Sequence, residues 1–346
     1  MHPKFTPFIL KWYHQNGRSL PWRETHDAYR IWVSEIILQQ TRVEQGRAYY
    51  ERFIERFPSV KELAEASENE VLHLWQGLGY YSRARNMHTA AQQVMSLGGQ
   101  FPTKFVELRK LKGVGEYTAA AIASFAFDEP CAVVDGNVYR VLSRFMGEET
   151  PIDSTTGRRL FAELAIEMME SSQPALYNQA IMDFGALQCT PHIPNCDTCP
   201  LKETCAAYAA NIVDRLPIKA HRTCITDRYL TYICVRDTQG RILLQRRENN
   251  DIWRGLYQFF LIEKSQALTP TEVKASLPLG ELTLLTKNHI HQLSHQRLHT
   301  DFYHLKLAKD TPSLTGFWAK PSELEHYALP RLLTLLWESH SQFLTF

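Results

Sequence analysis

The first 210 residues carry apolar side chains at intervals of three to four residues, separated by polar positions and by glycines. This spacing places the apolar side chains on one face of an α-helix, and the glycines mark the turns between helices. The pattern predicts helices over Tyr29–Gln40, Val43–Phe57, Val60–Ala66, Glu70–Trp75, Ala84–Met95 and Tyr117–Phe127. Signals of a β-hairpin or of a solenoid repeat do not occur in this half. We therefore expect an all-α domain over residues 1–210.

The pattern changes after Tyr208. Residues 211–226 contain Pro217 and scattered basic residues without a sustained period, which is typical of a linker. Beyond the linker, short runs of aromatic and β-branched residues predict strands, and two later segments have a helical period. The predicted strands are Tyr229–Arg236, Arg241–Arg247 and Leu256–Ile262, and the predicted helices are Pro270–Ser276 and Leu329–Phe343. Residues 227–346 are thus expected to form a second, α+β domain.

Bulk composition adds little to this picture. A chain of 346 residues suits two domains, and a hydrophobic content of 44% is that of a globular protein. No apolar run approaches the roughly 20 residues that span a bilayer, and the N-terminus lacks the apolar core of a signal peptide. A cytoplasmic location is the default expectation. The formal net charge is only +1, so any prediction of nucleic-acid binding must rest on local motifs.

Four of the seven cysteines form the pattern C-x6-C-x2-C-x5-C, namely Cys189, Cys196, Cys199 and Cys205. Clustered cysteines in a reducing compartment indicate metal ligation rather than a disulfide framework. Four thiolates at this spacing can hold one tetrahedral metal or a [4Fe–4S] cluster. Structural zinc sites usually pair two C-x2-C motifs, and this pattern has one. Four buried thiols without a metal are the third alternative, which the regular spacing disfavours.

Residues 111–119 read L-K-G-V-G-E-Y-T-A and predict two helices joined by a tight hairpin. Gly113 and Gly115 let the backbone turn sharply and approach another surface, and the free N–H groups of the following helix suit a DNA phosphate. An ordinary interhelical turn is the alternative. About twenty residues later, Asp135 lies in V-V-D-G-N-V, a sequence that by itself predicts a turn or a helix N-cap.

Glu35 lies in a stretch that is apolar nearly all round, among Trp32, Val33, Ile36 and Ile37. A carboxylate in such surroundings is desolvated, and desolvation raises its pKa toward the value that a general acid needs at neutral pH. The alternative is a solvated glutamate at a helix surface or N-terminus, which is the commoner situation for an isolated glutamate.

Several motifs together give a specific resemblance. P-W-R over 21–23, W-V-S-E-I-I-L-Q-Q-T over 32–41 and G-L-G-Y-Y-S-R-A-R-N over 77–86 resemble the signature of adenine DNA glycosylases of the MutY type. The hairpin, the D-G-N sequence and the cysteine pattern follow in the order of the helix-hairpin-helix (endonuclease III) superfamily. The family usually has proline where this chain has Lys112, which replaces a rigid turn residue with a positive charge. The resemblance favours a [4Fe–4S] cluster on the four cysteines.

The resemblance implies two carboxylates with different tasks. Adenine leaves deoxyribose readily only when it is protonated, so Glu35 is implied as the acid that protonates N7 and later activates water. The sugar becomes oxocarbenium-like as the bond breaks, and Asp135 is implied as the anion that stabilises or traps it. Tyr117 and Asn137 match supporting positions. Bifunctional members have a nucleophilic lysine where this chain has Tyr117, so the resemblance implies a monofunctional glycosylase.

The same resemblance assigns contacts to DNA. The target base must leave the helical stack before an acid can reach it. Residues matching DNA-contacting or base-contacting positions of the family are Arg23 and Asp183 at the adenine pocket, Gln40 and Tyr81 around the partner base, and Lys112, Gly113 and Gly115 in the hairpin. For Tyr81 the alternative is a core aromatic residue. The expected partner is double-stranded DNA with 8-oxoguanine:adenine or guanine:adenine mispairs, bound by a monomer at the nucleoid.

The second domain resembles the Nudix-like domain of this family, which recognises the lesion. Q-R-R over 245–247 and I-W-R-G-L-Y over 252–257 match its early strands, with Arg254 at a position that is usually glycine. No R-E-x-x-E-E helix occurs, which argues against pyrophosphohydrolase activity. Residues 291–295 match the H-x-F-S-H loop of the family, with Leu293 for phenylalanine. Ser294 and His295 are thereby implied in lesion recognition.

Two other functions and one other metal site are the alternatives, beside the Nudix hydrolase that the missing R-E-x-x-E-E helix disfavours. A bifunctional pyrimidine-lesion glycosylase and AP lyase is disfavoured by Glu35 and Tyr117. A non-catalytic iron–sulfur protein that binds damaged DNA is disfavoured by the presence of both Glu35 and Asp135. A metal site on the five histidines between 289 and 304 is disfavoured because no carboxylates or thiols cluster with them.

Overall fold

The computed structural model describes residues 5–169, 172–221, 224–278, 280–309 and 314–344. The chain divides into two compact units. The first unit contains residues 1–65 and 89–222, and the second contains residues 66–88 and 223–346. The described helices include none that is long and apolar enough to cross a membrane.

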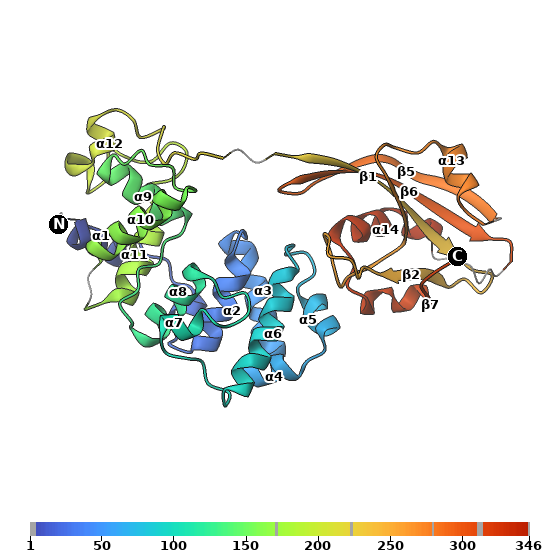
Figure 1. Cartoon of the computed structure of the whole chain (residues 1–346), viewed down its shortest axis with the longest axis horizontal. Coiled ribbons are helices and arrows are strands. Elements are labelled where there is room, and N and C mark those ends of the chain that lie inside the picture. Colours follow the sequence, from blue (N-terminus) through green and yellow to red (C-terminus); the bar gives the residue numbers. More distant parts are fainter. Residues whose placement is uncertain (1–4, 170–171, 222–223, 279, 310–313, 345–346) are drawn as a thin grey trace. The chain divides into compact units, whose positions relative to one another are not determined.

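The first unit is helical (Figure 1). Its elements are α1 (Phe5–Asn16), η1 (Pro21–Arg23), α2 (Ala28–Leu38), α3 (Val43–Arg56), α4 (Val60–Glu65), α7 (Phe105–Leu108), α8 (Glu116–Phe127), α9 (Gly136–Met146), α10 (Thr155–Met168), α11 (Pro174–Leu187), η2 (Lys202–Thr204) and α12 (Ala206–Ala209). The second half of α6 (Ser82–Ser96) also belongs to this unit. The predicted helices of residues 29–127 all occur, with ends shifted by at most two residues.

Side-chain caps fix where several of these helices begin. Asp27 accepts hydrogen bonds from the backbone N–H groups of Tyr29 and Arg30, and Ser154 accepts one from Gly157. Such caps satisfy donors that have no partner within the helix. Helix α8 ends at Asp128, which adopts a left-handed conformation (φ +50°). The chain can therefore turn from α8 directly toward the segment that carries Asp135.

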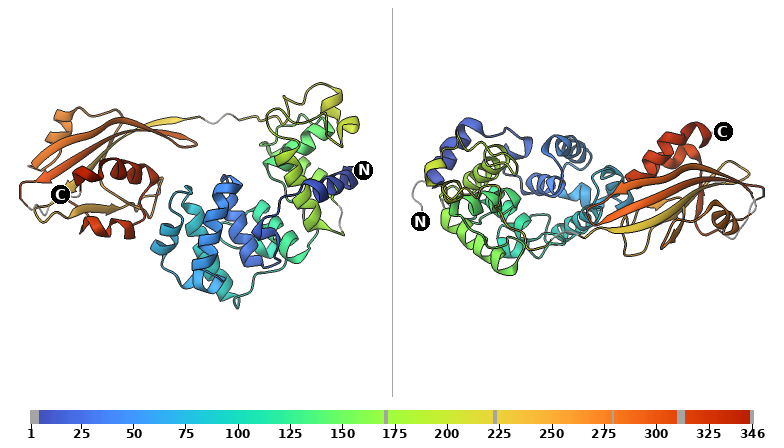
Figure 2. Two further views of the ribbon diagram at one scale, coloured as in Figure 1. Left: turned by 180° about the vertical axis from the view of Figure 1, so that it is seen from behind. Right: turned by 90° about the horizontal axis from the view of Figure 1, so that it is seen from above.

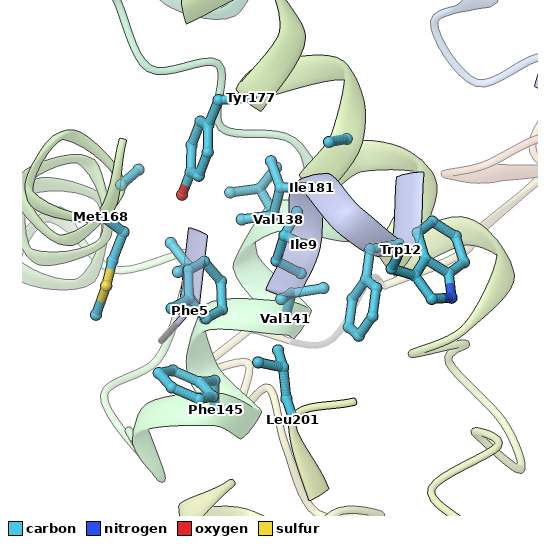
Figure 3. Close-up of a cluster of buried hydrophobic side chains, with 14 of the residues drawn as sticks. Phe5, Ile9, Trp12, Val138, Val141, Phe145, Met168, Tyr177, Ile181 and Leu201 are labelled. Carbon is cyan, nitrogen blue, oxygen red and sulfur yellow. The ribbon is translucent and has the colours of Figure 1, made fainter. Parts of the chain in front are cut away.

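The core beside the N-terminal helix joins segments that are far apart in the sequence. Figure 3 shows Phe5, Ile9 and Trp12 of α1 against apolar side chains of α9 and α11. The indole of Trp12 meets the ring of Phe184 edge-on at 5.0 Å. Burial of large apolar side chains at about 1.5–3 kcal/mol each makes this cluster a major source of stability for the unit. It also fixes α9 against α11, and both of these helices carry residues of the candidate active site.

Gly185 allows α11 and α9 to approach each other closely. A Cβ atom added at Gly185 would lie 2.7 Å from Cβ of Asn137 and 3.0 Å from its carbonyl oxygen. These distances are shorter than normal carbon contacts, so any side chain at position 185 would push the two helices apart. The residue that α9 presents here, Asn137, directly follows Asp135 and Gly136.

The described residues of the second unit form a seven-stranded mixed sheet (Figure 2). Its elements are α5 (Glu68–Leu74), the first half of α6, β1 (Thr226–Arg236), β2 (Ile242–Arg246), β3 (Tyr257–Gln258), β4 (Phe260–Lys264), α13 (Pro270–Ala275), β5 (Gly280–Gln292), β6 (Gln296–Leu307), β7 (Phe317–Ala319), η3 (Pro321–His326) and α14 (Arg331–Leu344). The main strand order is β3-β2-β1-β6-β5, with β4 paired to β1 and β7 to β2. Strands β1 and β6 are parallel, and the other pairs are antiparallel.

A helix covers each face of this sheet. Leu332, Leu333 and Leu336 of α14 pack on one set of strand residues, whereas Val273 of α13 packs on the opposite set. Because side chains alternate between the faces of a strand, β1 contributes to both cores. A sheet covered on both sides is the architecture expected of an α+β domain.

The predicted strand Leu256–Ile262 is divided in two. Tyr257–Gln258 pairs with β2, and Phe260–Lys264 pairs with β1. Phe259, at the break, is fully buried. The sequence predicts one strand because aromatic and β-branched residues continue across the break. Only the pairing with two different partner strands separates the two pieces.

The predicted linker, residues 211–226, is tied to the first unit over part of its length. Backbone N–H groups of Ala220 and His221 donate to the carboxylate of Asp153 at 2.8 and 3.0 Å. The backbone of Ile152 also donates to the carbonyl of Ile218 at 3.0 Å. Of this segment, residues 222 and 223 lie outside the described residues.

Candidate active site

A cavity of about 600 Å³ opens in the helical unit. Its wall includes the residues that the sequence singled out for chemistry and adenine binding, namely Arg23, Glu35, Tyr117, Asp135 and Asn137. Helices α2 and α8 supply Glu35 and Tyr117, and Asp135 is the residue that caps the N-terminus of α9. A volume of this size is in the usual range for a pocket that takes a small molecule or one base of a nucleic acid.

Glu35 lies on α2 and is only 7% exposed. The phenolic O–H of Tyr117 donates to its Oε2 atom over 2.6 Å. Desolvation by burial raises the pKa of Glu35 to about 7, and the nearby charge of Asp135 adds to the rise. The hydrogen bond from Tyr117 and the charge of Arg23 act in the opposite direction. Glu35 can therefore hold or release a proton near neutral pH, as an acid–base catalyst requires.

Asp135 caps the N-terminus of α9. Its Oδ1 atom accepts from the backbone N–H groups of Asn137 and Val138, each at 2.8 Å. Its Oδ2 atom accepts from the side-chain amide of Asn137 at 2.7 Å. Burial raises the pKa of Asp135, while these hydrogen bonds lower it. A carboxylate held by three donors at a helix N-terminus is oriented before any substrate binds.

A second helical residue orients the amide of Asn137. The guanidinium of Arg140 donates to Oδ1 of Asn137 at 2.8 Å and to the carbonyl of Gly185 at 2.7 Å. Because Oδ1 is occupied as an acceptor, the NH₂ group of Asn137 faces Asp135. Arg140, three residues after Asn137 on the same helix, completes a chain of contacts that ends at the Asp135 carboxylate. The sequence motifs did not point to Arg140.

Two arginines of the cavity wall, Arg18 and Arg23, bind the fully buried carboxylate of Asp183. Arg23 donates to both oxygens of Asp183, at 2.7 and 2.9 Å, and Arg18 donates from its backbone at 3.0 Å and from its guanidinium. Burial acts to raise the pKa of Asp183, but the hydrogen bonds from Arg23 and Arg18 outweigh it and hold the pKa below its usual value. Arg18 and Arg23 line the cavity, whereas Asp183 is not part of its lining and contacts it through these two arginines. The sequence motifs named Arg23 and Asp183 but gave no signal for Arg18, and the role of these residues in adenine binding stays a prediction.

The predicted hairpin lies between α7 and α8. Gly113 has a φ of +75°, which favours glycine, and the backbone N–H of Lys112 donates to Gln93 at 2.7 Å. A Cβ atom added at Gly115 would meet nothing within 4 Å. The chain itself thus leaves open space above this residue, at the start of α8. Gln40 follows α2, is exposed and also has a positive φ, +58°.

The four clustered cysteines line one small cavity together with Arg144 and Lys202. The guanidinium of Arg144 donates to Sγ of Cys189 at 3.4 Å, and the thiol of Cys205 donates to the carbonyl of Arg144 at 3.4 Å. In the described part of the chain, no group of three or more histidine, cysteine or acidic side chains is arranged to hold a single metal ion.

A cavity of about 450 Å³ lies within the second unit. The predicted recognition residues Ser294 and His295 are part of its wall, as are Trp253 and the two tyrosines of the G-L-G-Y-Y motif. Tyr81 is buried, at 4% exposure, and the backbone N–H of Gly77 donates to its hydroxyl at 3.3 Å. Tyr80 is 44% exposed and its hydroxyl contacts that of Ser294. Of these two tyrosines, the sequence motifs named only Tyr81, and its role stays a prediction.

Two family models match the chain. Residues 33–164 match the HhH-GPD superfamily base excision DNA repair protein model, and residues 231–339 match the NUDIX domain model. The first match covers α2 through most of α10 and includes Glu35, Tyr117 and Asp135. The second covers most of the sheet and α14.

Curated relatives match over both units. The chain is 34% identical over 301 residues to the adenine DNA glycosylase of Buchnera aphidicola subsp. Baizongia pistaciae, covering 85% of this chain and 84% of the relative. It is 32% identical over 336 residues to that of Buchnera aphidicola subsp. Schizaphis graminum, covering 94% and 96%. The adenine DNA glycosylase of Mus musculus is 44% identical over 214 residues, covering 59% and 42%.

Solved structures match the helical part. A thermostable thymine-DNA glycosylase has a TM-score of 0.57 and 28% sequence identity, covering 60% of this chain and 96% of its own. An endonuclease III in a non-covalent complex with DNA has a TM-score of 0.53 at 19% identity, covering 61% and 96%. The latter likeness concerns the fold alone.

Proposed function

The chain belongs to the adenine DNA glycosylase family, and on this premise we propose that it removes adenine mispaired with 8-oxoguanine or guanine in double-stranded DNA. The observation that carries the proposal is the pair of carboxylates in one cavity. Glu35 has a pKa of about 7, whereas Asp135 is fixed by three hydrogen bonds. Two carboxyl groups with different environments are what an acid and an anionic stabiliser need.

The reaction follows from these two environments. Glu35 gives its proton to N7 of an extruded adenine. The electrons of the N-glycosidic bond then move onto the protonated base, which leaves as neutral adenine. The sugar is left as an oxocarbenium-like cation, and the oriented carboxylate of Asp135 stabilises or traps it. The carboxylate of Glu35 then takes a proton from water as the water oxygen attacks the sugar. Glu35 ends protonated, ready for the next turnover.

The surrounding residues support this assignment of roles. Tyr117 donates to Glu35 at 2.6 Å and supplies no amine, so an imine with the sugar cannot form at this position. Asn137 keeps Asp135 oriented, with its own amide held by Arg140. Arg23, anchored on Asp183, lies on the wall at which adenine would be held.

We also propose the DNA contacts that the resemblance implies. Lys112, Gly113 and Gly115 form a hairpin at the start of α8, where open space above Gly115 suits a phosphate. Gln40 and Tyr81 would fill the gap around the partner base. Because Tyr81 is buried, its side chain would have to move out of the interior to fill this gap. Otherwise the neighbouring, exposed Tyr80 would fill the gap in its place. The enzyme is expected to act as a monomer at the nucleoid.

Recognition of 8-oxoguanine is assigned to Ser294 and His295. Both line a cavity of the second unit that also contains aromatic side chains against which a base can lie flat. A hydroxyl group and an imidazole offer the hydrogen bonds that distinguish an oxidised guanine from guanine. Leu293, at the position of a family phenylalanine, lines the cavity together with Ile252 and Trp253, so an aromatic ring is still present at this wall.

A [4Fe–4S] cluster is proposed for Cys189, Cys196, Cys199 and Cys205. Such a cluster takes four thiolates, and the four side chains line one cavity with no competing acidic ligand at its wall. Protein purified without oxygen is expected to contain roughly four irons and to absorb broadly near ~400 nm. Zinc without visible absorption would contradict the proposal. Cys199→Ala should lose the absorption, whereas the matched control Cys224→Ala, at an exposed cysteine outside the group, should keep it.

The test of the function is a single-turnover assay on duplexes that contain adenine opposite 8-oxoguanine, guanine, cytosine or thymine. We expect adenine release opposite 8-oxoguanine and guanine, fastest opposite 8-oxoguanine, with an abasic site and no strand cleavage until alkali is added. Excision of an oxidised pyrimidine with strand cleavage would instead indicate the bifunctional activity. Binding without release of any base would contradict the enzymatic assignment.

A further inference from the structure

Arg228 of β1 uses its whole guanidinium to hold neighbouring side chains. Its Nη1 and Nη2 atoms donate to the two oxygens of Asp251 at 2.9 and 2.7 Å, and Nη1 also donates to Gln296 at 3.1 Å. Its Nε and Nη2 atoms donate to the carboxylate of Glu263 at 2.7 and 2.9 Å. An arginine has five N–H donors, and this one makes five hydrogen bonds. Its side chain is 15% exposed.

Two of these partners, Asp251 and Gln296, belong to different segments of the wall of the 450 Å³ cavity. Asp251 begins the 251–253 segment, which lines the cavity up to Trp253. Gln296 ends the 292–296 segment, which carries Ser294 and His295. Arg228 is outside the lining, so it touches the cavity only through these two side chains. The third partner, Glu263 of β4, also lies outside the lining.

A second arginine, Arg247, also binds the 251–253 segment. Arg247 donates to Oδ2 of Asp251 at 2.8 Å and to the carbonyl of Ile252 at 2.9 Å, and its guanidinium lies 5.9 Å from the ring of Trp253. The hydrogen bonds from Arg228 hold the pKa of Asp251 below its usual value despite partial burial. Bidentate arginine–carboxylate pairs fix geometry as well as charge. The 251–253 segment therefore has a defined position, and Arg228 transmits that position to Gln296.

We propose that Arg228 is a positioning residue for lesion recognition. It sets the separation between the 251–253 segment and the 292–296 segment. Ser294 and His295 are thereby held at a fixed distance from Trp253, on the other segment of the cavity wall, when the oxidised base binds. The inference rests on the recognition role proposed above for Ser294 and His295. It assigns to Arg228 no contact with DNA and no part in the chemistry of adenine release.

The test compares two substitutions of Arg228 with a matched control. Arg228→Gln removes both the charge and the planar guanidinium that binds two partners at once. Arg228→Lys keeps the charge, but an ammonium group cannot bridge two partners in a fixed geometry. Glu263→Gln changes the third partner of the same guanidinium and leaves both links to the cavity wall. The quantity measured is the ratio of single-turnover rate constants for adenine opposite 8-oxoguanine and opposite guanine, at DNA concentrations below saturation.

Both Arg228 variants should lower this ratio by about tenfold, the scale of about 1.4 kcal/mol within the usual range for one good base contact. Adenine release opposite guanine should stay within about twofold of wild type, because the carboxylate pocket lies in the other unit. Glu263→Gln should keep the ratio. A merely structural role of Arg228 would lower the thermal midpoint and leave the ratio unchanged. That outcome, or an equal fall with Glu263→Gln, overturns the proposal.

Two further variants keep the test decisive. Gln296→Met removes only the 3.1 Å link to Arg228, and it replaces Arg228→Gln should that variant fail to fold. The double variant Ser294→Ala with His295→Ala serves as the reference. If it lowers the ratio and the Arg228 variants do not, positioning by Arg228 is wrong and lesion recognition stands. If the double variant also keeps the wild-type ratio, the recognition role itself is wrong.

Discussion

Two carboxyl groups, Glu35 at the active-site cavity and Asp251 at the 450 Å³ cavity, lie in opposite environments. In the helical unit, burial raises the pKa of Glu35 to about 7, and the phenolic O–H of Tyr117 donates to this side chain over 2.6 Å. In the second unit, Arg228 and Arg247 bind Asp251, and hydrogen bonding lowers the pKa of this carboxylate. The first environment keeps a proton exchangeable, whereas the second keeps a loop in place. Catalysis and recognition thus require different solvation of the same chemical group.

The two carboxyl groups contribute to the stability of the folded state with opposite signs. A buried carboxyl group with a raised pKa destabilises the folded state whenever it is ionised. A carboxylate that is bound by two arginines stabilises the folded state as long as both partners remain. Substitution of Glu35 should therefore change the rate of adenine release more than folding, and substitution of the residues that hold Asp251 should change selectivity.

The largest expected effect is that of Glu35→Gln. The amide has the shape of the acid but cannot deliver a proton, so adenine release should fall by about 10²–10⁴-fold or more. Binding to a mispair should be retained, because the side chain keeps its volume. Single-turnover cleavage and a parallel binding titration measure the two quantities. Release at a rate near that of wild type would refute the role of Glu35 as the acid.

Asp135→Asn is expected to slow adenine release by about 10²–10³-fold, because the charge that faces the developing cation is lost. The asparagine can still accept the backbone N–H groups at the start of α9, so the helix cap should survive. Ser154→Ala, which removes the cap of α10 away from the cavity, is the matched control for a purely structural loss. It should lower the unfolding midpoint and leave the rate constant unchanged.

Ser294→Ala combined with His295→Ala should act on selectivity alone. The loss of about 1–3 kcal/mol, typical of one good base contact, corresponds to a fall of roughly 5–150-fold in the 8-oxoguanine:guanine rate ratio. Adenine release opposite guanine should be preserved. If Glu35→Gln changed this ratio, or if the double variant reduced release opposite both bases equally, the division of labour between the two cavities would be wrong.

The pH dependence gives a smaller effect with a definite sign. Protonated Glu35 is the active acid, so the single-turnover rate constant should fall as the pH rises through about 7. The hydrogen bond from Tyr117 lowers the pKa of Glu35. Tyr117→Phe should therefore move the alkaline limb of the profile to higher pH. A shift to lower pH, or no shift, would contradict the geometry of this pair.

The same pKa predicts a change in stability. The pKa of Glu35 in the folded state, about 7, lies above its usual value of 4.5. Its contribution to stability is then complete below about pH 4.5 and is lost as the pH rises through about 7. Glu35→Gln, which does not ionise, should unfold at a higher temperature than wild type at pH 8, with a smaller difference at pH 5. Calorimetry at the two pH values measures it.

Local patterns predicted most of the elements and the principal site residues. The apolar neighbours of Glu35 predicted its burial, and D-G-N predicted the helix cap at Asp135, because both effects depend on residues close in the sequence. The roles of these residues stay predictions. The NUDIX match confirms the expected fold of the second domain.

Features that depend on distant partners could not be predicted. Arg18 and Asp183 are 165 residues apart and meet only because α11 lies against the N-terminal helix. Arg228 finds Asp251 and Gln296 through the register of β1 with β6 and through a loop of irregular backbone. The division between β3 and β4 likewise arises from pairing with different strands. None of these contacts is indicated by a periodic pattern of apolar and polar residues in the sequence.

Gly185 is a position that tolerates no side chain, although no sequence motif marks it. It belongs to no catalytic or binding motif, yet a single methyl group added there would collide with Asn137, the residue that orients Asp135. In a clinical or evolutionary survey of variants, Gly185→Ala would be scored as a mild change between small residues. The contact distance predicts instead a substitution that inactivates the enzyme from outside its active-site signature. Interpretation of variants in this family therefore needs interhelical spacing as well as motif membership.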